Sequence, residues 1–259
     1  MSDFLDRYNK RVGRNGKNIG ESYNKNTITF IESTFANAPT FRKVGVISTE
    51  FPEITEMDAR VIEVERLGTL REVLFRPNQN LNVGTYLTFD DEIWVIFGKY
   101  GTGVSSKVLV SKCNRTLKWK DNNDQIKEYY CVASATDLGS KAKQSKDEIE
   151  WNKYDVRLPL GQLFIFVEAN EDTESIQLNN RFIFGRKVFE ITGVDDVTSV
   201  DRNGYGIIQF TAKVTTIQNG DDFENRIALN KNYEEINNQS QQTLIPEVKD
   251  DDVSGGRIW

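Results

Sequence analysis

The sequence predicts a mainly β protein: a barrel or sandwich built from two related β modules, with short N-terminal helices and an extended C-terminal tail. Three observations indicate this fold class. From residue 41 onward, short β-branched and aromatic runs alternate with turn residues, a texture typical of barrels and sandwiches. The run at 81–96, LNVGTYLTFDDEIWVI, has the form of a β-hairpin with an acidic turn. The run at 178–191, LNNRFIFGRKVFEI, repeats that form, which indicates a duplicated scaffold.

Length and charge limit the class of protein. The chain has 259 residues, enough for one large β domain or two small ones. Its net charge of −6 argues against nucleic acid as the main partner, because that binding depends on neutralising phosphates. The N-terminus lacks the apolar block of a signal peptide, and no apolar run approaches about 18 residues. We therefore expect a protein that is made in a cytosol and does not enter a membrane.

Reactive side chains are few. The chain has no histidine, which removes the commonest general base and the commonest zinc ligand. Cys113 and Cys131 lie in apolar runs, so we expect buried, reduced thiols. Neighbouring acids can bind a metal or act as acid and base, but those at 90–91, 195–196 and 221–222 sit at expected turns, where Asp is favoured for backbone reasons. We expect no enzymatic activity and assign no catalytic, cofactor-binding or metal-binding residue.

The N-terminal arm, residues 1–40, is expected to be helical. Apolar residues at helical spacing predict a short helix over 2–12 and a second one over 21–36. The β-branched run at 27–29 leaves a strand as the alternative there. The apolar residues of the second helix are expected to pack in the core: Phe30, Ile31 and Phe35.

The first β module is expected over 41–136 and the second over 156–233. Strands with a period near two, such as 60–65, alternate with Gly, Pro and Asn breaks in the first module. The second module opens with the apolar run 163–167 and ends in a segment, 223–233, whose apolar spacing predicts a short helix.

A polar insertion at 137–155 separates the two modules, and a polar tail follows at 234–259. The insertion is either a solvated loop or a loop that orders on a partner, with its lysines facing DNA or an acidic subunit. Trp151 favours a contact, because Trp is enriched at interfaces. The tail is expected to be extended or disordered, and its apolar tip is either an anchor on a neighbouring subunit or a frayed end. The candidate inter-subunit or channel contacts are Lys141, Lys143, Lys146, Trp151 and Trp259.

Two functions compete once enzymatic activity is set aside. Basic residues adjoin aromatics at 118–120, 181–182 and 186–187, as on β-barrels that bind single-stranded nucleic acid. Strand edges often carry such charges only to prevent edge pairing, so this signal is unspecific. An assembly subunit accounts for more features at once, because an arm, two modules, an insertion and an apolar-tipped tail all serve subunit contacts.

Three blocks of the sequence resemble structural proteins of tailed bacteriophages that infect Gram-positive bacteria. They are FLDRYNKRVGRNGKNIGESYNKNTITFIESTF, SATDLGSKAKQSKDEIEWNKYDVRLPLGQLFIFVEAN and LNNRFIFGRKVFEITGVDDVTSVDRNGYGIIQFT, and the likeness spans most of residues 1–230. Within that group, the strand around Trp94 after an acidic turn, together with FGRKVFEITGV, resembles head-to-tail connector (neck or head-closure) proteins.

The resemblance implies a virion protein, made in the host cytoplasm, that forms an oligomeric β-barrel ring between portal and tail and surrounds the DNA channel. The partners it implies are copies of the same chain in a cyclic homo-oligomer, portal or adaptor and tail proteins, and DNA through non-specific contact in the channel, with no membrane. It implies no enzymatic activity and no cofactor. The alternatives are another virion subunit, of the tail or the minor capsid, and a single-stranded nucleic-acid-binding β-barrel protein.

Overall fold

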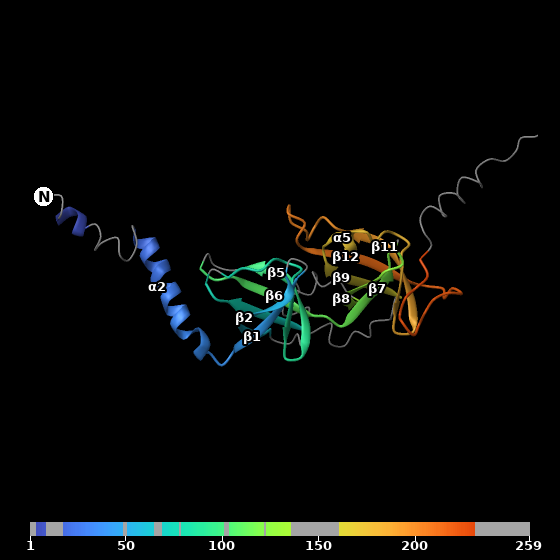
Figure 1. Ribbon diagram of the computed structural model, residues 1–259, viewed down its shortest axis with the longest axis horizontal. Helices are drawn as coiled ribbons and strands as arrows, with labels where there is room; N and C mark the ends of the chain where they lie inside the picture. Colours follow the sequence, from blue (N-terminus) through green and yellow to red (C-terminus); the bar gives the residue numbers. More distant parts are fainter. Residues whose placement is uncertain are drawn as a thin grey trace, which may run out of the picture.

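The computed structural model describes residues 4–8, 18–48, 51–64, 69–77, 79–100, 104–121, 123–135 and 161–230. The protein is mainly β, as the sequence predicts, with two six-stranded units and a helix that projects from one end (Figure 1). We refer to the units as the first barrel and the second barrel. None of the helices described in these ranges is long and apolar enough to cross a bilayer.

The first barrel is a closed antiparallel sheet with the strand order β1-β2-β3-β6-β5-β4. Its strands are β1 (Phe41–Ser48), β2 (Phe51–Glu63), β3 (Leu70–Phe75), β4 (Tyr86–Phe89), β5 (Glu92–Tyr100) and β6 (Lys107–Lys112). β4 pairs with both β5 and β1, which closes the barrel. Alternate side chains such as Val73, Leu87 and Ile96 point inward and fill its core.

The second barrel repeats this strand order. Its sheet runs β7-β8-β9-β12-β11-β10, so each strand takes the place of the strand six earlier in the chain. The strands are β7 (Arg115–Lys120), β8 (Ile126–Ser134), β9 (Gln162–Glu168), β10 (Arg181–Phe184), β11 (Lys187–Asp195) and β12 (Ile207–Thr215). β7 and β10 approach each other through Trp119 and Phe182, whose ring centroids are 6.2 Å apart. This is the position at which β1 and β4 pair in the first barrel.

The two predicted hairpins are confirmed. The hairpin of β4 and β5 turns at Asp90 and Asp91, which have left-handed φ angles of 52° and 58°, as a type I′ turn requires. The hairpin of β10 and β11 turns at Gly185 and Arg186, with Gly185 at a φ of 64°. In both, a two-residue turn matches the twist of the flanking strands and sets the register.

The equivalence of the hairpins extends to their irregularities. The register shifts just after Ile96 in β5 and just after Ile191 in β11. The main chain of Ile96 bonds to Gly84 and Thr85, and that of Ile191 bonds to Asn179 and Asn180 in the same pattern. A shared strand order and a shared bulge support the duplicated scaffold that the sequence indicates.

The boundary between the barrels differs from the predicted one. The first module was expected over 41–136, but β7 and β8 belong to the second barrel, because residues 132–134 pair with 164–166 of β9. The boundary therefore lies between β6 and β7, and the expected insertion at 137–155 falls inside the second barrel, between β8 and β9. The alternation of apolar and polar residues shows that a strand has a buried face, but it does not show which core that face joins. The sequence pattern therefore assigned β7 and β8 to the wrong module.

An apolar interface joins the two barrels into one packed body. Phe97 of β5 meets Phe166 of β9 edge to face, with ring centroids 5.3 Å apart. Tyr86 of β4 is 3% exposed and donates its hydroxyl to the carbonyl oxygen of Tyr130 in β8 at 2.6 Å. Burial raises the pKa of Tyr86 well above its ordinary value, so this hydroxyl stays protonated and remains a donor.

Some local predictions need correction. The second N-terminal helix is confirmed as α2 (Ile19–Thr34), so the strand alternative at 27–29 is wrong. Phe35 is buried in the core as expected and Ile31 is partly buried, but Phe30 is 68% exposed. The described part of the segment expected to be helical at 223–233 forms turns instead, because the Asp222 carboxylate accepts from the backbone N–H of Asn225 at 2.9 Å.

Candidate functional site

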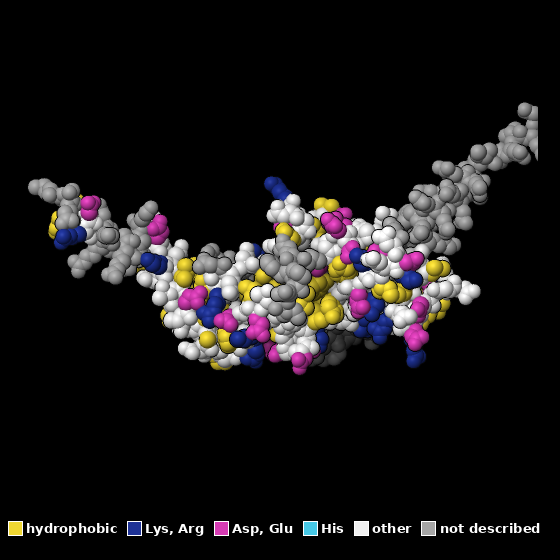
Figure 2. Space-filling model, viewed as in Figure 1, with side chains coloured by type: hydrophobic (Ala, Val, Ile, Leu, Met, Phe, Trp, Pro, Cys, Tyr) yellow, Lys and Arg dark blue, Asp and Glu magenta, His cyan; other side chains and the backbone are white. Residues whose placement is uncertain are grey.

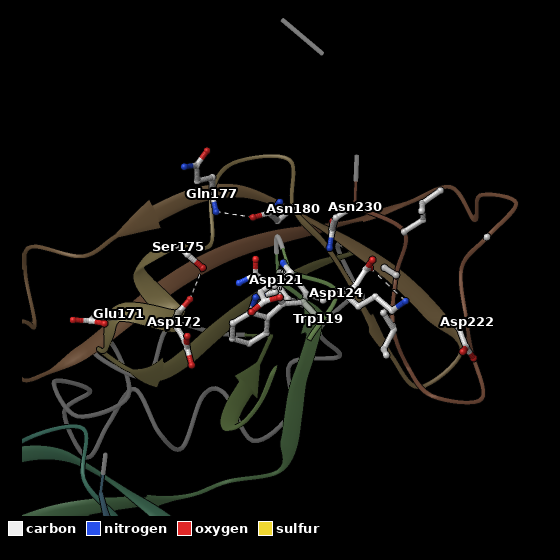
Figure 3. Close-up of a pocket in the computed structure, with 17 residues that line it drawn as sticks. Trp119, Asp121, Asp124, Glu171, Asp172, Ser175, Gln177, Asn180, Asp222 and Asn230 are labelled. Carbon is white, nitrogen blue, oxygen red and sulfur yellow. Dashed lines mark hydrogen bonds and ion pairs between the residues drawn. The ribbon is translucent and has the colours of Figure 1, made fainter. Parts of the chain in front are cut away.

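A pocket of about 660 Å³ opens on the second barrel (Figure 3). It lies between the turn that joins β7 to β8, the short helix α5 (Glu171–Glu174), the segment that precedes β10 and the loop that follows β12. Three connections that are far apart in the sequence therefore meet around one concavity: the β7–β8 turn, the β9–β10 connection that contains α5, and the loop after β12. Their meeting is a consequence of the strand order, which brings β7 beside β10.

The pocket combines an apolar inner wall with an acidic rim. Buried residues form the inner wall, which consists of Trp119, Phe182, Ile227 and Ala228. The carboxylates that line the pocket are Asp121, Asp124, Glu171, Asp172 and Asp222. Lys120 is the basic residue among the lining residues, so the rim is negative overall. Such a site can take an apolar group that carries positive charge beside it.

Turn and cap chemistry positions the rim on the β7–β8 side and at α5. The Asp121 carboxylate accepts from the backbone N–H groups of Asn123 at 2.8 Å and Gln125 at 2.9 Å, which folds the turn back on itself. Asn170 and Thr173 form a reciprocal capping box at the start of α5, with bonds of 2.9 and 3.0 Å. The capping box fixes the direction in which α5 presents its acidic first turn.

Asp172 is held in its ionised form. Tyr129 donates its hydroxyl to the carboxylate at 2.7 Å, and the Lys127 ammonium lies 3.0 Å from it. The bond from Tyr129 is the main cause that lowers the pKa of Asp172 below its ordinary value, and Lys127 adds to it, whereas partial burial acts the other way. The rim therefore stays negative at neutral pH.

A buried ion pair fixes the wall that the loop after β12 supplies. Arg181 of β10 donates from both terminal nitrogens to the two carboxylate oxygens of Asp221, at 2.9 and 2.8 Å. The same guanidinium donates to the carbonyl oxygens of Leu229 and Thr216, at 3.0 and 2.8 Å. The side chains of Arg181 and Asp221 are 6% and 0% exposed, so this pair is structural and is not one of the solvated turns that the sequence suggested.

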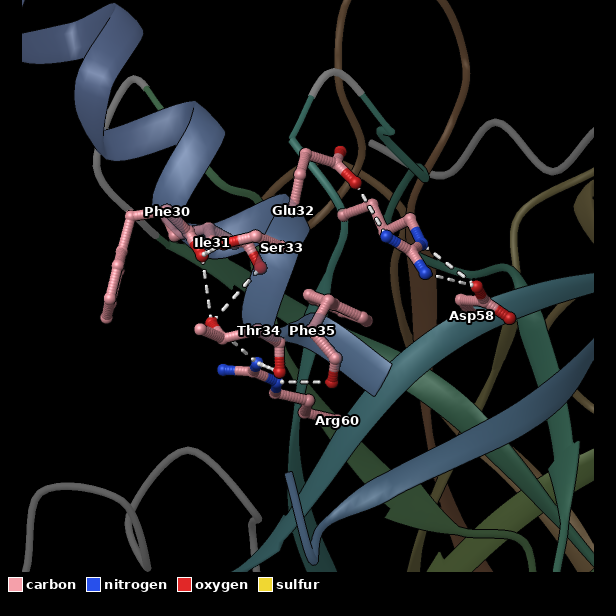
Figure 4. A network of polar contacts seen from close by, with 9 residues as sticks. Phe30, Ile31, Glu32, Ser33, Thr34, Phe35, Asp58 and Arg60 are labelled. Atoms are coloured by element: carbon pink, nitrogen blue, oxygen red, sulfur yellow. Dashed lines mark hydrogen bonds and ion pairs between the residues drawn. The ribbon is translucent and has the colours of Figure 1, made fainter. Parts of the chain in front are cut away.

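At the other end of the molecule, α2 is fixed to the first barrel at its C-terminal end (Figure 4). Phe35 is fully buried, with the guanidinium groups of Arg60 and Arg76 at 4.7 and 4.8 Å from its ring centroid. Arg60 donates to the carbonyl oxygens of Thr34 and Phe35, at 2.7 and 3.1 Å. Arg76 bridges Glu32 of the helix to the barrel. These contacts set the direction in which the helix leaves the barrel.

Beyond this anchor, α2 carries an exposed apolar stripe. Ile19, Tyr23 and Phe30 are 77%, 70% and 68% exposed, and helical spacing places them on one face. None of the α2 residues is buried. The helix turn at residues 4–8 adds three exposed apolar side chains, those of Phe4, Leu5 and Tyr8. Apolar surface arranged in this way marks a contact site.

The candidate contacts from the sequence are not among the residues just described. Lys141, Lys143, Lys146, Trp151 and Trp259 lie outside the described residues, so these assignments stay predictions. Sequence reasoning missed the pocket. Its only signals were the polar turns at 121–124 and 219–222, which the sequence marks as turns but does not bring together.

Four of the aromatic and basic residues suggested for nucleic acid have structural roles, whereas Lys120, Arg186 and Lys187 are exposed. Trp119 and Phe182 are 6% and 1% exposed and belong to the core of the second barrel, so little of either ring is open to a base. The guanidinium of Arg181 is engaged in its ion pair with Asp221, and the Lys118 ammonium lies 2.8 Å from the Glu128 carboxylate. Figure 2 shows acidic and basic side chains interspersed over the visible face of the barrels. The residues that suggested single-strand binding are therefore not arranged as a stacking surface.

The thiols and carboxylates of the described part of the chain do not form a metal centre. No group of three or more His, Cys, Asp or Glu side chains in that part could hold a metal ion. Cys131 is buried as expected, whereas Cys113 is only partly buried. Burial raises the pKa of Cys113 to about 12 and also raises that of Cys131.

A family model described as the YomX C-terminal domain matches residues 115–213. The match begins at the first residue of β7 and ends in β12, so it coincides with the second barrel. This also supports the placement of β7 and β8 with the later strands. No curated protein and no solved structure matches the chain. The second barrel thus matches a phage-associated domain, which supports a phage protein and is consistent with a Gram-positive host.

Proposed function

We propose that the chain is a virion structural protein of a tailed phage, and that copies of it form a ring of the head-to-tail connector. In this proposal the ring joins portal or adaptor proteins to tail proteins and surrounds the DNA channel, with non-specific DNA contact in its lumen. The protein is made in the host cytoplasm and ends in the virion. It acts through shape and contact surface, without enzymatic activity or a cofactor.

One observation carries the proposal: two packed barrels hold a helix whose apolar face has no cover within the described residues. A helix fixed at its base and exposed above it is a contact element for another molecule. The phage-associated domain at 115–213 supports a virion context. Repeated subunits in cyclic assemblies commonly use such elements to hold their neighbours.

The test has two parts. Light scattering and negative-stain imaging of the purified full chain should reveal closed rings of one stoichiometry. The measurement includes high protein concentrations, such as those that subunits reach when they gather on a portal complex. Gold-labelled antibody against the chain should mark the neck of intact virions. Label on the tail tube or on capsid faces would replace the connector role by another virion role. A chain that is missing from virions and binds oligonucleotides as a monomer would overturn the proposal altogether.

A separate test addresses the predicted lysine contacts. Replacing Lys141, Lys143 and Lys146 by Gln removes three positive charges and leaves both described barrels unchanged. If these lysines contact DNA or an acidic subunit, the variant should fold normally but incorporate poorly into virions. Normal incorporation of the variant into virions would show that these three lysines are not contact residues.

A further inference from the structure

We propose that the arm of one copy docks into the pocket of a second copy, so that subunits join head to tail. The arm here means the helix turn at 4–8 together with α2, and the pocket is the acidic-rimmed concavity of the second barrel. This inference deepens the proposed function and rests on it for the identity of the neighbour. The argument uses the stability of α2, the area that it exposes, and the charge of the two surfaces.

The sequence of α2 is a poor helix former when no partner covers it. Its interior is rich in β-branched residues and Asn, which lower helix propensity, and it has 16 residues. The hydroxyls of Thr27 and Thr29 bond back to the carbonyl oxygens of Tyr23 and Lys25, at 2.8 and 2.9 Å, an arrangement that slightly weakens helices. Isolated helices shorter than about 12–15 residues are marginal in water even with Ala-rich sequences, and α2 is only slightly longer. Packing on another molecule supplies the stabilisation that α2 lacks.

The exposed apolar area of the arm suits a protein interface. Phe4, Tyr8, Tyr23 and Phe30 are 75%, 57%, 70% and 68% exposed. Since an aromatic side chain buries about 150–250 Å² when it is covered completely, these four rings offer on the order of 500 Å². A stable interface buries about 800 Å² on each partner. The four rings therefore provide most of one side of such an interface, and aromatic residues are the usual hot spots.

The pocket is the matching surface in charge and chemistry. Its inner wall is apolar, its rim carries five carboxylates, and the exposed side chain of Leu229 lies on it. Residues 4–34 carry six basic side chains against three acidic ones, Asp6, Glu21 and Glu32, so the arm together with the sequence between its two pieces has a net charge of +3. An apolar and basic element thus faces an apolar and acidic one.

The two surfaces lie at opposite ends of the molecule. In Figure 1, α2 projects from the first barrel on the side away from the second barrel, which carries the pocket. Because α2 leads away from the second barrel of its own chain, we assign its docking to the pocket of another copy. A contact between unlike surfaces of identical chains is heterologous, and it closes into a ring when the rotation between subunits permits.

Two variants of the full chain separate the surfaces. The arm variant is Tyr23→Gln with Phe30→Gln, at exposed helix positions where Gln is a good helix former. The pocket variant is Asp124→Asn with Glu171→Lys, which removes most of the negative charge of the rim; Asn tolerates the left-handed φ of 59° at position 124. Val197→Ser is the matched control, because Val197 is 78% exposed and lies neither on the arm nor in the pocket lining.

The measurement is self-association by sedimentation velocity, with the fold of each variant checked by circular dichroism. The arm variant alone and the pocket variant alone should remain monomers, because each loses the contact on one side. An equimolar mixture should form heterodimers that do not grow, because one intact arm can still enter one intact pocket. Each lost aromatic hot spot should weaken association about 30-fold, and added salt should weaken it further. Val197→Ser should associate as the unaltered chain does.

Failure of this inference is distinguishable from failure of the proposed function. If the arm variant or the pocket variant alone still forms the oligomers of the unaltered chain, the docking inference is overturned, and the connector ring stands. If the mixture forms heterodimers but the unaltered chain gives open filaments, the docking stands and the ring fails. If the unaltered chain and the mixture both stay monomeric up to the highest soluble concentration, the arm serves another partner and the inference is overturned.

Discussion

The buried pair of Arg181 and Asp221 should control the stability of the second barrel and of its pocket. Asp221→Asn keeps the size of the side chain but leaves the guanidinium without its counter-charge, in a place where the Arg181 side chain is only 6% exposed. Breaking a buried pair on one side costs about 3–5 kcal/mol. For a domain of this size, each kcal/mol lowers Tm by about 2–4 °C. We therefore expect Tm to fall by roughly 6–20 °C.

Calorimetry and urea unfolding at neutral pH measure this effect. Glu56→Gln is the matched control, because it removes an exposed ion pair in which the side chains of Lys43 and Glu56 are 67% and 70% exposed. The loss of this pair should lower the free energy of unfolding by at most about 1 kcal/mol. The double variant Arg181→Met with Asp221→Leu should recover much of the loss, since apolar residues of similar volume can replace a buried pair. A Tm for Asp221→Asn within about 2 °C of the unaltered chain would refute the reasoning.

The same pair predicts a pH dependence. Burial alone would raise the pKa of Asp221, but the bonds from Arg181 and from the backbone N–H groups of Gln218 and Leu229 outweigh it and lower the pKa. A carboxyl whose pKa is lowered by folding adds stability above its unfolded pKa, about 3.9, and loses that contribution as pH falls through its folded pKa. The deficit of Asp221→Asn should therefore be full at pH 7 and should shrink below about pH 4. A deficit that is constant from pH 7 to pH 2.5 would contradict this account.

Three further predictions concern the interior. Tyr86→Phe removes the hydrogen bond to the partly buried carbonyl oxygen of Tyr130 and should cost about 0.5–1.5 kcal/mol in urea unfolding, whereas Tyr23→Phe, at a ring that is 70% exposed, should cost almost nothing. Gly84 has a φ of 94°, and Gly84→Ala would place a Cβ 2.1 Å from the carbonyl oxygen of Gly206. This variant should therefore loosen the contact between the barrels and speed proteolysis between them. Gly98→Ala, whose Cβ meets open space, is the control, and equal cleavage rates for the two variants would exclude the clash. Burial raises the pKa of Cys113 to about 12 and also raises that of Cys131, so neither thiol should react with a disulfide reagent at pH 8 until the chain is unfolded; prompt reaction of the native chain would show that the thiols are accessible.

Much of the fold could be predicted from local patterns. The acidic turn at Asp90 and Asp91 and the turn at Gly185 each carry the residue types that a two-residue hairpin needs, so both hairpins follow from the sequence. The apolar spacing over 21–36 places α2 within a few residues of its observed bounds. These features depend on neighbours in the chain, and such information is local.

Contacts between distant residues decided the rest. The sequence placed Phe30 in the core with Phe35, but only Phe35 meets the first barrel, because Arg60 and Arg76 hold that ring and the helix then leads away. Helical spacing shows that a face is apolar and does not show what covers it. The exposure of Phe30, which carries the docking inference, is therefore a property of the tertiary structure.

The sequence by itself determined that this is a β protein with two equivalent hairpins, an N-terminal helical arm and little reactive chemistry, because turn geometry and hydrophobic period are encoded locally. Only the tertiary structure decided that β7 and β8 join the second barrel, and that the turns at 121–124 and 219–222 meet α5 around one acidic pocket. The physical reason is that strand pairing joins residues that are remote in the chain, and a strand's own residues do not specify its partner. The pocket, one of the two surfaces on which the assembly of this protein is proposed to depend, is a product of that pairing.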